Sequence, residues 1–113
     1  MKLTGKCKTD FEEWYLRQDY SKQGQYEYGQ RKALNMFNAM MLPFRWGVYV
    51  DFFAVNEIYI EITFDKPTKL ELMKWWVDIN NVEVVDNDNS EFDTLNNARL
   101  TAIKHSNEIY NAQ

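Results

Sequence analysis

The chain has 113 residues, a length that suits one domain, residues 1–113, with a single modest hydrophobic core. Apolar residues make up 45% of it and charged residues 27%, with four Gly and two Pro, which excludes a long flexible linker or a low-complexity tail. The net charge of −4 argues against strong direct binding of nucleic acid, because phosphate contacts need clustered Lys and Arg.

The beginning of the chain and the single cysteine indicate where the protein resides. Cys7 has no partner for an internal disulfide, which suits a cytoplasmic setting. No apolar run approaches the ~20 residues of a membrane span, and the first residues lack the apolar segment of a secretory signal. The densest basic group, Lys2, Lys6 and Lys8, is interpreted as a solvated helix end. We therefore expect a cytoplasmic protein with no membrane partner.

Helical periodicity predicts two helices in the first third of the chain. The first begins after Thr4, a good N-cap residue, and runs to about Gln18. The segment Ser21–Gln25 (SKQGQ) breaks the pattern, and a second helix follows to about Met41. The apolar stripe expected on the first helix is Cys7, Phe11, Trp14 and Tyr15, and that on the second is Tyr26, Ala33, Leu34, Phe37, Met40 and Met41.

The segment Gly47–Asn56 has two interpretations. Its Val, Tyr and Phe residues favour a strand, but a strand from Val48 to Phe64 would far exceed the usual length of about six residues. Asn56 also fits a left-handed helix stop directly before a clean alternation begins. We expect a nearly buried helix after Pro43, with a strand as the alternative. The stripe that this helix would bury is Trp46, Tyr49, Val50 and Phe53.

Alternating side chains predict an antiparallel sheet in the second half of the chain. The first strand is expected to bury Ile58, Ile60, Ile62 and Phe64. After a turn at Asp65–Lys69, a second strand, Leu70–Asn80, is expected to bury Met73, Trp75, Val77 and Ile79. A short third strand at Val82–Val85 is optional, and Thr94 is expected to cap a last helix that ends near Asn111. The predicted fold class is α+β, with a small antiparallel sheet of two to three strands and about four helices.

No pattern in the sequence predicts a catalytic site. Asp86–Asp93 alternates oxygen-bearing side chains as a calcium loop does, but Glu91 and Asn97 replace the Gly and the bidentate Glu that such a loop needs. His105 is the single histidine, whereas zinc sites need several His or Cys ligands. Cys7 lies on the apolar stripe of its helix, so a buried thiol is favoured over a Cys–His nucleophilic pair. We expect no enzyme activity, no metal and no cofactor.

The second face of the predicted sheet is a candidate partner-binding site. An exposed Trp adds nothing to the core, and its usual role is as an interface anchor. Trp76 would lie on this face, unless the last helix crosses it and buries the ring, which is the alternative. The predicted partner-binding residues are Tyr59, Glu61, Leu72, Lys74 and Trp76.

Three stretches together resemble a group of small uncharacterised accessory proteins of bacteriophages and prophages: LTGKCKTDFEEWYL (Leu3–Leu16), LPFRWGVYVDFF (Leu42–Phe53) and ARLTAIKHSNEIYN (Ala98–Asn111). Related sequences are expected to carry a Gly between the central helix and the strand, where this chain has Asn56 and Glu57. The resemblance brings no catalytic residues.

What the resemblance implies is a role in the cytoplasm of a host cell. It implies a non-enzymatic inhibitor, an anti-CRISPR or other anti-defence protein, that binds a host protein or ribonucleoprotein complex such as a CRISPR effector nuclease. One alternative is a virion or replication accessory protein that acts through self-association as a homo-oligomer. Another is a weak nucleic-acid-binding module that uses exposed aromatic rings for stacking, against which the negative charge counts.

Overall fold

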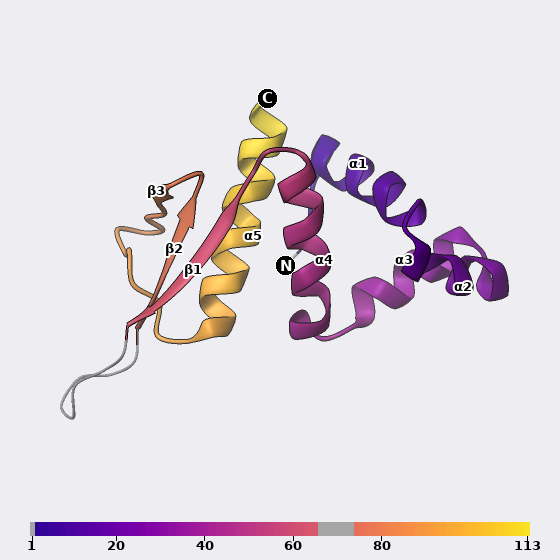
Figure 1. The fold of residues 1–113 in the computed structure, drawn as a ribbon, viewed down its shortest axis with the longest axis horizontal. Coiled ribbons are helices and arrows are strands. Elements are labelled where there is room, and N and C mark those ends of the chain that lie inside the picture. The colour runs from indigo at the N-terminus through magenta and orange to yellow at the C-terminus, as the bar shows by residue number, and fades with distance from the viewer. Residues whose placement is uncertain (1, 66–73) are drawn as a thin grey trace.

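The computed structural model describes residues 2–65 and 74–113, which form five helices and one antiparallel three-stranded sheet (Figure 1). The elements are α1 (Gly5–Leu16), α2 (Asp19–Tyr28), α3 (Gln30–Ala39), α4 (Leu42–Val55), β1 (Ile60–Asp65), β2 (Lys74–Ile79), β3 (Val82–Glu83) and α5 (Leu95–Ala112). The predicted α+β class with a small sheet is confirmed. Residues 66–73, which hold most of the predicted turn and the start of the predicted second strand, lie outside the described residues.

The sheet has strand order β1-β2-β3, and α5 packs against one of its faces. β2 and β3 are joined by Asn80 and Asn81, which have φ angles of 52° and 64°. Positive φ at both central residues is what a two-residue hairpin turn of type I′ requires, and Asn tolerates it. β3 is shorter than the predicted segment Val82–Val85, since it ends at Glu83.

α4 confirms the helical interpretation of the central segment. Pro43 lies in its first turn, where the missing N–H costs nothing. Of the predicted stripe, Tyr49 and Phe53 are buried and Trp46 and Val50 are half-buried, whereas Phe52, which was not assigned to the stripe, is buried. The predicted stop at Asn56 is wrong by one residue, because Asn56 has φ −103° and Glu57 takes the left-handed φ of 63°. The Asn56 amide instead donates to the Phe52 carbonyl at 2.8 Å, which satisfies a free carbonyl of the last turn.

The predicted break at Ser21–Gln25 is wrong, because this segment lies inside α2. Three of its polar side chains, Ser21, Lys22 and Gln25, bond to the backbone. The Ser21 hydroxyl donates to the Gln18 carbonyl at 2.8 Å, and the Gln25 amide donates to the Leu16 carbonyl at 2.7 Å. These bonds join the end of α1 to α2, so the polar residues stabilise a helical corner.

The actual break between the second and third helices is at Gly29, whose φ of 85° is accessible to Gly without strain. This shift changes the buried stripe. Tyr26 is 91% exposed, and Met40 and Met41 are also exposed, so these three predicted core residues are wrong. Ala33, Leu34 and Phe37 are buried, as predicted.

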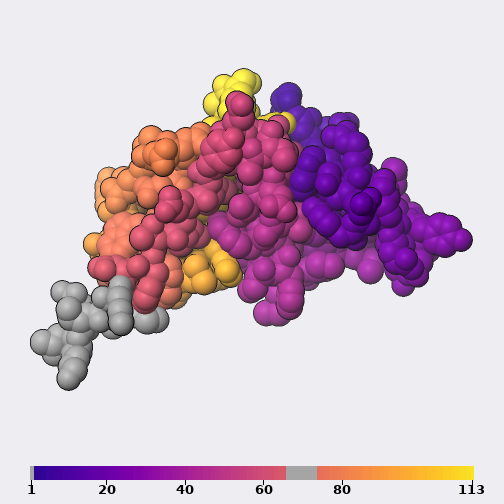
Figure 2. Space-filling view, viewed as in Figure 1, coloured from indigo at the N-terminus to yellow at the C-terminus, as the bar shows by residue number. Residues whose placement is uncertain are grey.

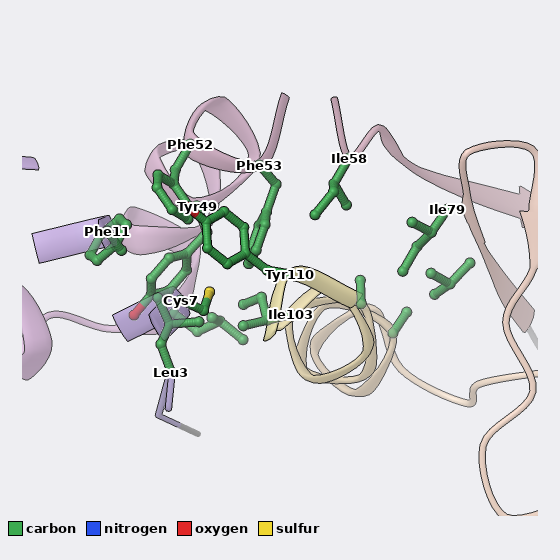
Figure 3. Packing of buried hydrophobic residues seen from close by; sticks show 14 of the residues in the cluster. Leu3, Cys7, Phe11, Tyr49, Phe52, Phe53, Ile58, Ile79, Ile103 and Tyr110 are labelled. Carbon is green, nitrogen blue, oxygen red and sulfur yellow. The ribbon is translucent and has the colours of Figure 1, made fainter. Parts of the chain in front are cut away.

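The core is built around aromatic rings from α1, α3 and α4. The ring of Phe11 lies at the centre, with ring centroids 5.6 Å from Phe37, 5.2 Å from Tyr49 and 5.3 Å from Phe52. Phe52 in turn lies 5.5 Å from Tyr110 on α5, which connects these helices to the layer behind the sheet. Figure 3 shows this continuity, from Phe11 at one end of the core to Ile79 of the sheet at the other. Among the described helices, none has the length and apolar character of a membrane span.

The first turn of α1 is capped by α5 rather than by its own N-cap residue. Thr4 occupies the predicted N-cap position, but its side chain forms no capping bond. The Cys7 N–H instead donates to Asn111 Oδ1 at 2.8 Å, and Asn111 Nδ2 donates to the Thr4 carbonyl at 2.9 Å. Gly5 has φ 61°, and a Cβ atom there would lie 3.1 Å from the Asn111 amide. A glycine at this position therefore permits the close approach of the two helices.

We predict that Asn111→Ala lowers the free energy of unfolding by about 1 kcal/mol, the usual cost of losing a helix cap. The matched control is Asn96→Ala, at an exposed position in the first turn of the same helix. Chemical denaturation of both variants measures the difference. Equal stability of the two variants would contradict the cap that Asn111 provides.

Candidate functional site: the outer face of the sheet

The pairing of β1 with β2 determines which side chains share a face. Glu61 lies opposite Asp78, Thr63 opposite Trp76, and Asp65 opposite Lys74. Because side chains alternate along a strand, these residues lie on one face, together with Tyr59, and Ile60, Ile62 and Val77 lie on the other. The outer face is formed by Tyr59, Glu61, Thr63, Asp65, Lys74, Trp76, Asp78 and, from β3, Glu83.

The described part of the inner face matches the prediction with one exception, and Met73, also predicted there, lies outside the described residues. Ile58 and Val77 are fully buried, and Ile60 and Ile62 are half-buried against the core. Phe64 was expected in the core but is 46% exposed. It lies near the end of β1 that extends away from the helices (Figure 1), where its ring packs on Trp75 at 5.2 Å.

Four of the five predicted partner-binding residues lie together on the outer face, and Leu72 lies outside the described residues. Tyr59 is 59% exposed, and Glu61 is exposed beside it. The Tyr59 backbone is fixed by Asn80, whose N–H donates to the Tyr59 carbonyl at 2.9 Å and whose side-chain oxygen accepts from the Tyr59 N–H at 2.8 Å. Lys74 and Trp76 are half-buried.

Trp76 does not pack into the core, because α5 lies behind the opposite face. Val77 and Ile79 belong to the same buried cluster as Ala98 and Ala102 of α5, and Trp75 packs against this cluster. Within the described residues, Trp76 is neither a member of the core nor one of the side chains packed against it. Figure 2 shows β1 and β2 at the surface of this part of the molecule.

Three carboxylates form a row across the outer face. Glu61 on β1 lies opposite Asp78 on β2, and Asp78 lies opposite Glu83 on β3. Directly opposite side chains have Cβ atoms about 5 Å apart, a separation at which like charges repel. The prediction from sequence included Glu61 but not Asp78 or Glu83. The consecutive asparagines Asn80 and Asn81 are typical of a two-residue hairpin turn, and such a turn would have predicted that Glu83 lies opposite Asp78.

A hollow of about 620 Å³ lies on the outer face beside Glu61 and Asp78. Its lining residues are Glu57, Tyr59, Ile60, Glu61, Asp78, Asn80 and Asn81, which include three carboxylates and no Lys or Arg. Lys74 lies toward the other end and pairs with Asp93 at 2.7 Å; this hydrogen bond raises the pKa of Lys74. The open end of the outer face is therefore acidic, with aromatic rings of Tyr59 and Trp76 beside the charges.

Two residues considered for chemistry have structural roles. Burial, with a smaller effect of the Asp10 carboxylate, raises the pKa of the Cys7 thiol to about 12, so the reactive thiolate is scarce at neutral pH. His105 Nε2 lies 3.1 Å from Asp86, which also accepts from Lys104 at 2.9 Å. These hydrogen bonds lower the pKa of the Asp86 carboxyl. In the described residues, no three His, Cys, Asp or Glu side chains are grouped as metal ligands.

Sequence reasoning missed a second group of exposed apolar side chains, far from the sheet. The prediction placed Tyr26, Met40 and Met41 on the buried stripe of one long helix, but Gly29 divides that helix into α2 and α3 and the three side chains are exposed. They are Tyr20, Tyr26 and Tyr28 on α2 and Met40, Met41 and Phe44 at the corner between α3 and α4.

The two adjacent tryptophans provide a test of the register. We predict that Trp75→Ala lowers the free energy of unfolding by about 3 kcal/mol, the low end for a core aromatic, because Trp75 packs against the core but is half-buried. Trp76→Ala should cost about 1 kcal/mol or less, since its ring is outside the core. Thermal and chemical denaturation measure both. Interchanged effects would mean that the register is wrong by one residue.

The buried thiol provides a second test. We predict that a thiol reagent such as dithionitrobenzoate modifies Cys7 only slowly in the native protein and rapidly after denaturation, because the sulfur is buried and protonated. The release of the chromophore measures the rate. Rapid modification of the native protein would contradict the packing of Cys7 in the core.

Comparison of the chain with protein-family models, with curated proteins and with solved structures found no match. A function for this chain therefore has to be inferred from its own residues. The feature with the clearest binding character is the outer face, with its row of carboxylates and its two aromatic side chains.

Proposed function

We propose that this protein is a phage-encoded, non-enzymatic inhibitor that binds a host defence protein or ribonucleoprotein, such as a CRISPR effector nuclease, through the outer face of its sheet. The observation that carries the proposal is the row of Glu61, Asp78 and Glu83 beside Trp76 and Tyr59. The resemblance to phage accessory proteins supplies the biological setting.

In the acidic row like charges lie opposite one another, an arrangement that is expected to lower the stability of the free protein and therefore favours a role in binding. Opposite like charges in a sheet are destabilising, and Gln or Asn at these positions would remove the repulsion without changing the shape of the side chains. Features that break such a local rule without a structural gain are expected at functional sites. A cationic partner surface would turn the repulsion into attraction.

The charge of the outer face fits the partner class. Effector nucleases of the CRISPR type hold nucleic acid in positively charged channels. An acidic sheet face complements such a channel, and electrostatic complementarity speeds association and selects among partners. Trp76 and Tyr59 supply aromatic groups of the kind that dominate binding energy at interfaces. Occupying the channel would inhibit the nuclease without any chemical step.

Affinity capture tests this proposal. We predict that the wild-type protein captures one dominant protein or ribonucleoprotein from a lysate of the phage host, identified by mass spectrometry. Trp76→Ala should weaken its binding about thirtyfold, the effect of losing an interface hot spot. The triple variant Glu61→Gln, Asp78→Asn, Glu83→Gln should lose most binding at low salt, while its stability is unchanged or higher, because the repulsion is gone.

The matched control for the triple variant is Glu13→Gln, Asp51→Asn, Glu108→Gln, which changes the net charge equally at exposed helix positions. It should bind as the wild type does. Equal losses in both triple variants would show that net charge alone drives capture, against a site on the outer face. Recovery of only the protein itself would favour the self-associating accessory protein, and salt-resistant binding of one RNA would overturn the proposal.

A further inference from the structure

A second concave surface lies at the other end of the core, between α1, α3 and α4. It is a hollow of about 420 Å³, a volume within the usual range for sites of small ligands. The lining of this basic hollow includes Lys8, Phe11, Arg31, Asn35, Arg45 and Tyr49. None of these residues belongs to the outer face of the sheet, so the two surfaces can be tested separately.

The charge of the hollow is opposite to that of the whole protein. Four cations line it, Lys2, Lys8, Arg31 and Arg45, against a single carboxylate, Glu12. Glu12 pairs with Arg31 at 3.4 Å. Among residues 2–65 and 74–113, no carboxylate lies within 4.0 Å of the side-chain nitrogens of Lys2, Lys8 or Arg45. The hollow therefore concentrates positive charge in a chain whose net charge is −4.

Arg45 is held in place before any ligand arrives. Its Nε donates to the Met40 carbonyl at 2.9 Å, and its Nη1 donates to the Tyr49 hydroxyl at 2.9 Å. The guanidinium also lies over the Tyr49 ring, with 5.7 Å to the centroid. Arg has five N–H donors, so the two bonds leave donors for an anion. Because the guanidinium is already oriented, binding loses little side-chain entropy.

The rest of the lining suits the organic part of a small anion. The apolar part of the lining, called its floor below, includes Leu3, Phe11 and Tyr49, which lie at one end of the core in Figure 3. The ring centroids of Phe11 and Tyr49 are 5.2 Å apart. Asn35 and Asn38 are one helical turn apart on α3, and their amides both donate and accept hydrogen bonds. A site that combines an oriented guanidinium, further cations, an apolar floor and amides suits a phosphate attached to a ring that carries polar groups.

We propose that the basic hollow binds a small organic phosphate of mononucleotide size, with the phosphate at Arg45 and Lys8 and the ring between the floor and the Asn amides. The inference stands on the geometry of α1, α3 and α4 and does not depend on the partner of the outer face. Adenosine 5′-monophosphate is the probe, with adenosine and inorganic phosphate as the two parts of it.

Isothermal titration calorimetry of the full chain tests this proposal. We expect saturable binding of adenosine 5′-monophosphate that weakens with salt. Each part alone should bind about tenfold more weakly or worse, because adenosine lacks the hydrogen bonds of the charged phosphate and inorganic phosphate lacks the contacts of the ring. Arg45→Gln and Lys8→Gln should each weaken binding by a similar factor. Lys8 is exposed, so its variant folds even if Arg45→Gln does not. Arg17→Gln, an exposed cation outside the hollow, is the matched control and should bind normally.

Several outcomes would overturn the proposal. They are the absence of saturable binding at millimolar ligand, adenosine binding as tightly as the monophosphate, and equal losses in Arg17→Gln and Lys8→Gln. Binding of a glutamate-rich peptide in preference to the nucleotide would instead make the hollow a protein-docking surface. Backbone NMR shifts on titration locate the site, and shifts confined to β1 and β2 would also contradict it.

Discussion

The structure depends on the packing of one side chain, Phe11 of α1, between rings from two other helices. Phe37 attaches α3 to it, Tyr49 and Phe52 attach α4, and the contact of Phe52 with Tyr110 continues to α5 and the sheet. A chain of this length has little surface to bury, and aromatic rings bury the most area for each residue. This accounts for the aromatic residues of the core, which are part of a total of eighteen: seven Phe, seven Tyr and four Trp.

The same packing separates two surfaces of opposite charge. The outer face of the sheet carries the carboxylates of Glu61, Asp78 and Glu83, and the basic hollow carries Arg45 and Lys8 beside the edge of Phe11. In each case apolar or aromatic side chains lie next to the charges, the combination that gives a binding site both attraction and a desolvated contact. The negative net charge of the chain conceals this division, since it averages over both surfaces.

Local patterns in the sequence were enough for much of this architecture. The alternation from Ile58 to Ile62 predicts β1 and its buried face, and length alone favours a helix at α4 over an overlong strand. What the patterns could not show depends on contacts between distant residues. Gln25 stabilises α2 through the Leu16 carbonyl, so a segment that is polar enough for a loop is helical. The hollow draws on Lys2, Arg31 and Arg45, which no local pattern connects.

The cap that Asn111 places on α1 has a consequence for how the protein is made. Cys7 and Asn111 are 104 residues apart, and synthesis proceeds from the N-terminus, so the first helix leaves the ribosome long before its cap exists. A helix of twelve residues is marginal in water by itself. Rings of α3 and α4 are available to cover the aromatic stripe of α1 earlier, but the first turn of α1 stays uncapped until α5 has been translated. The N-terminal turn of α1 is therefore stabilised late, when α5 docks on it.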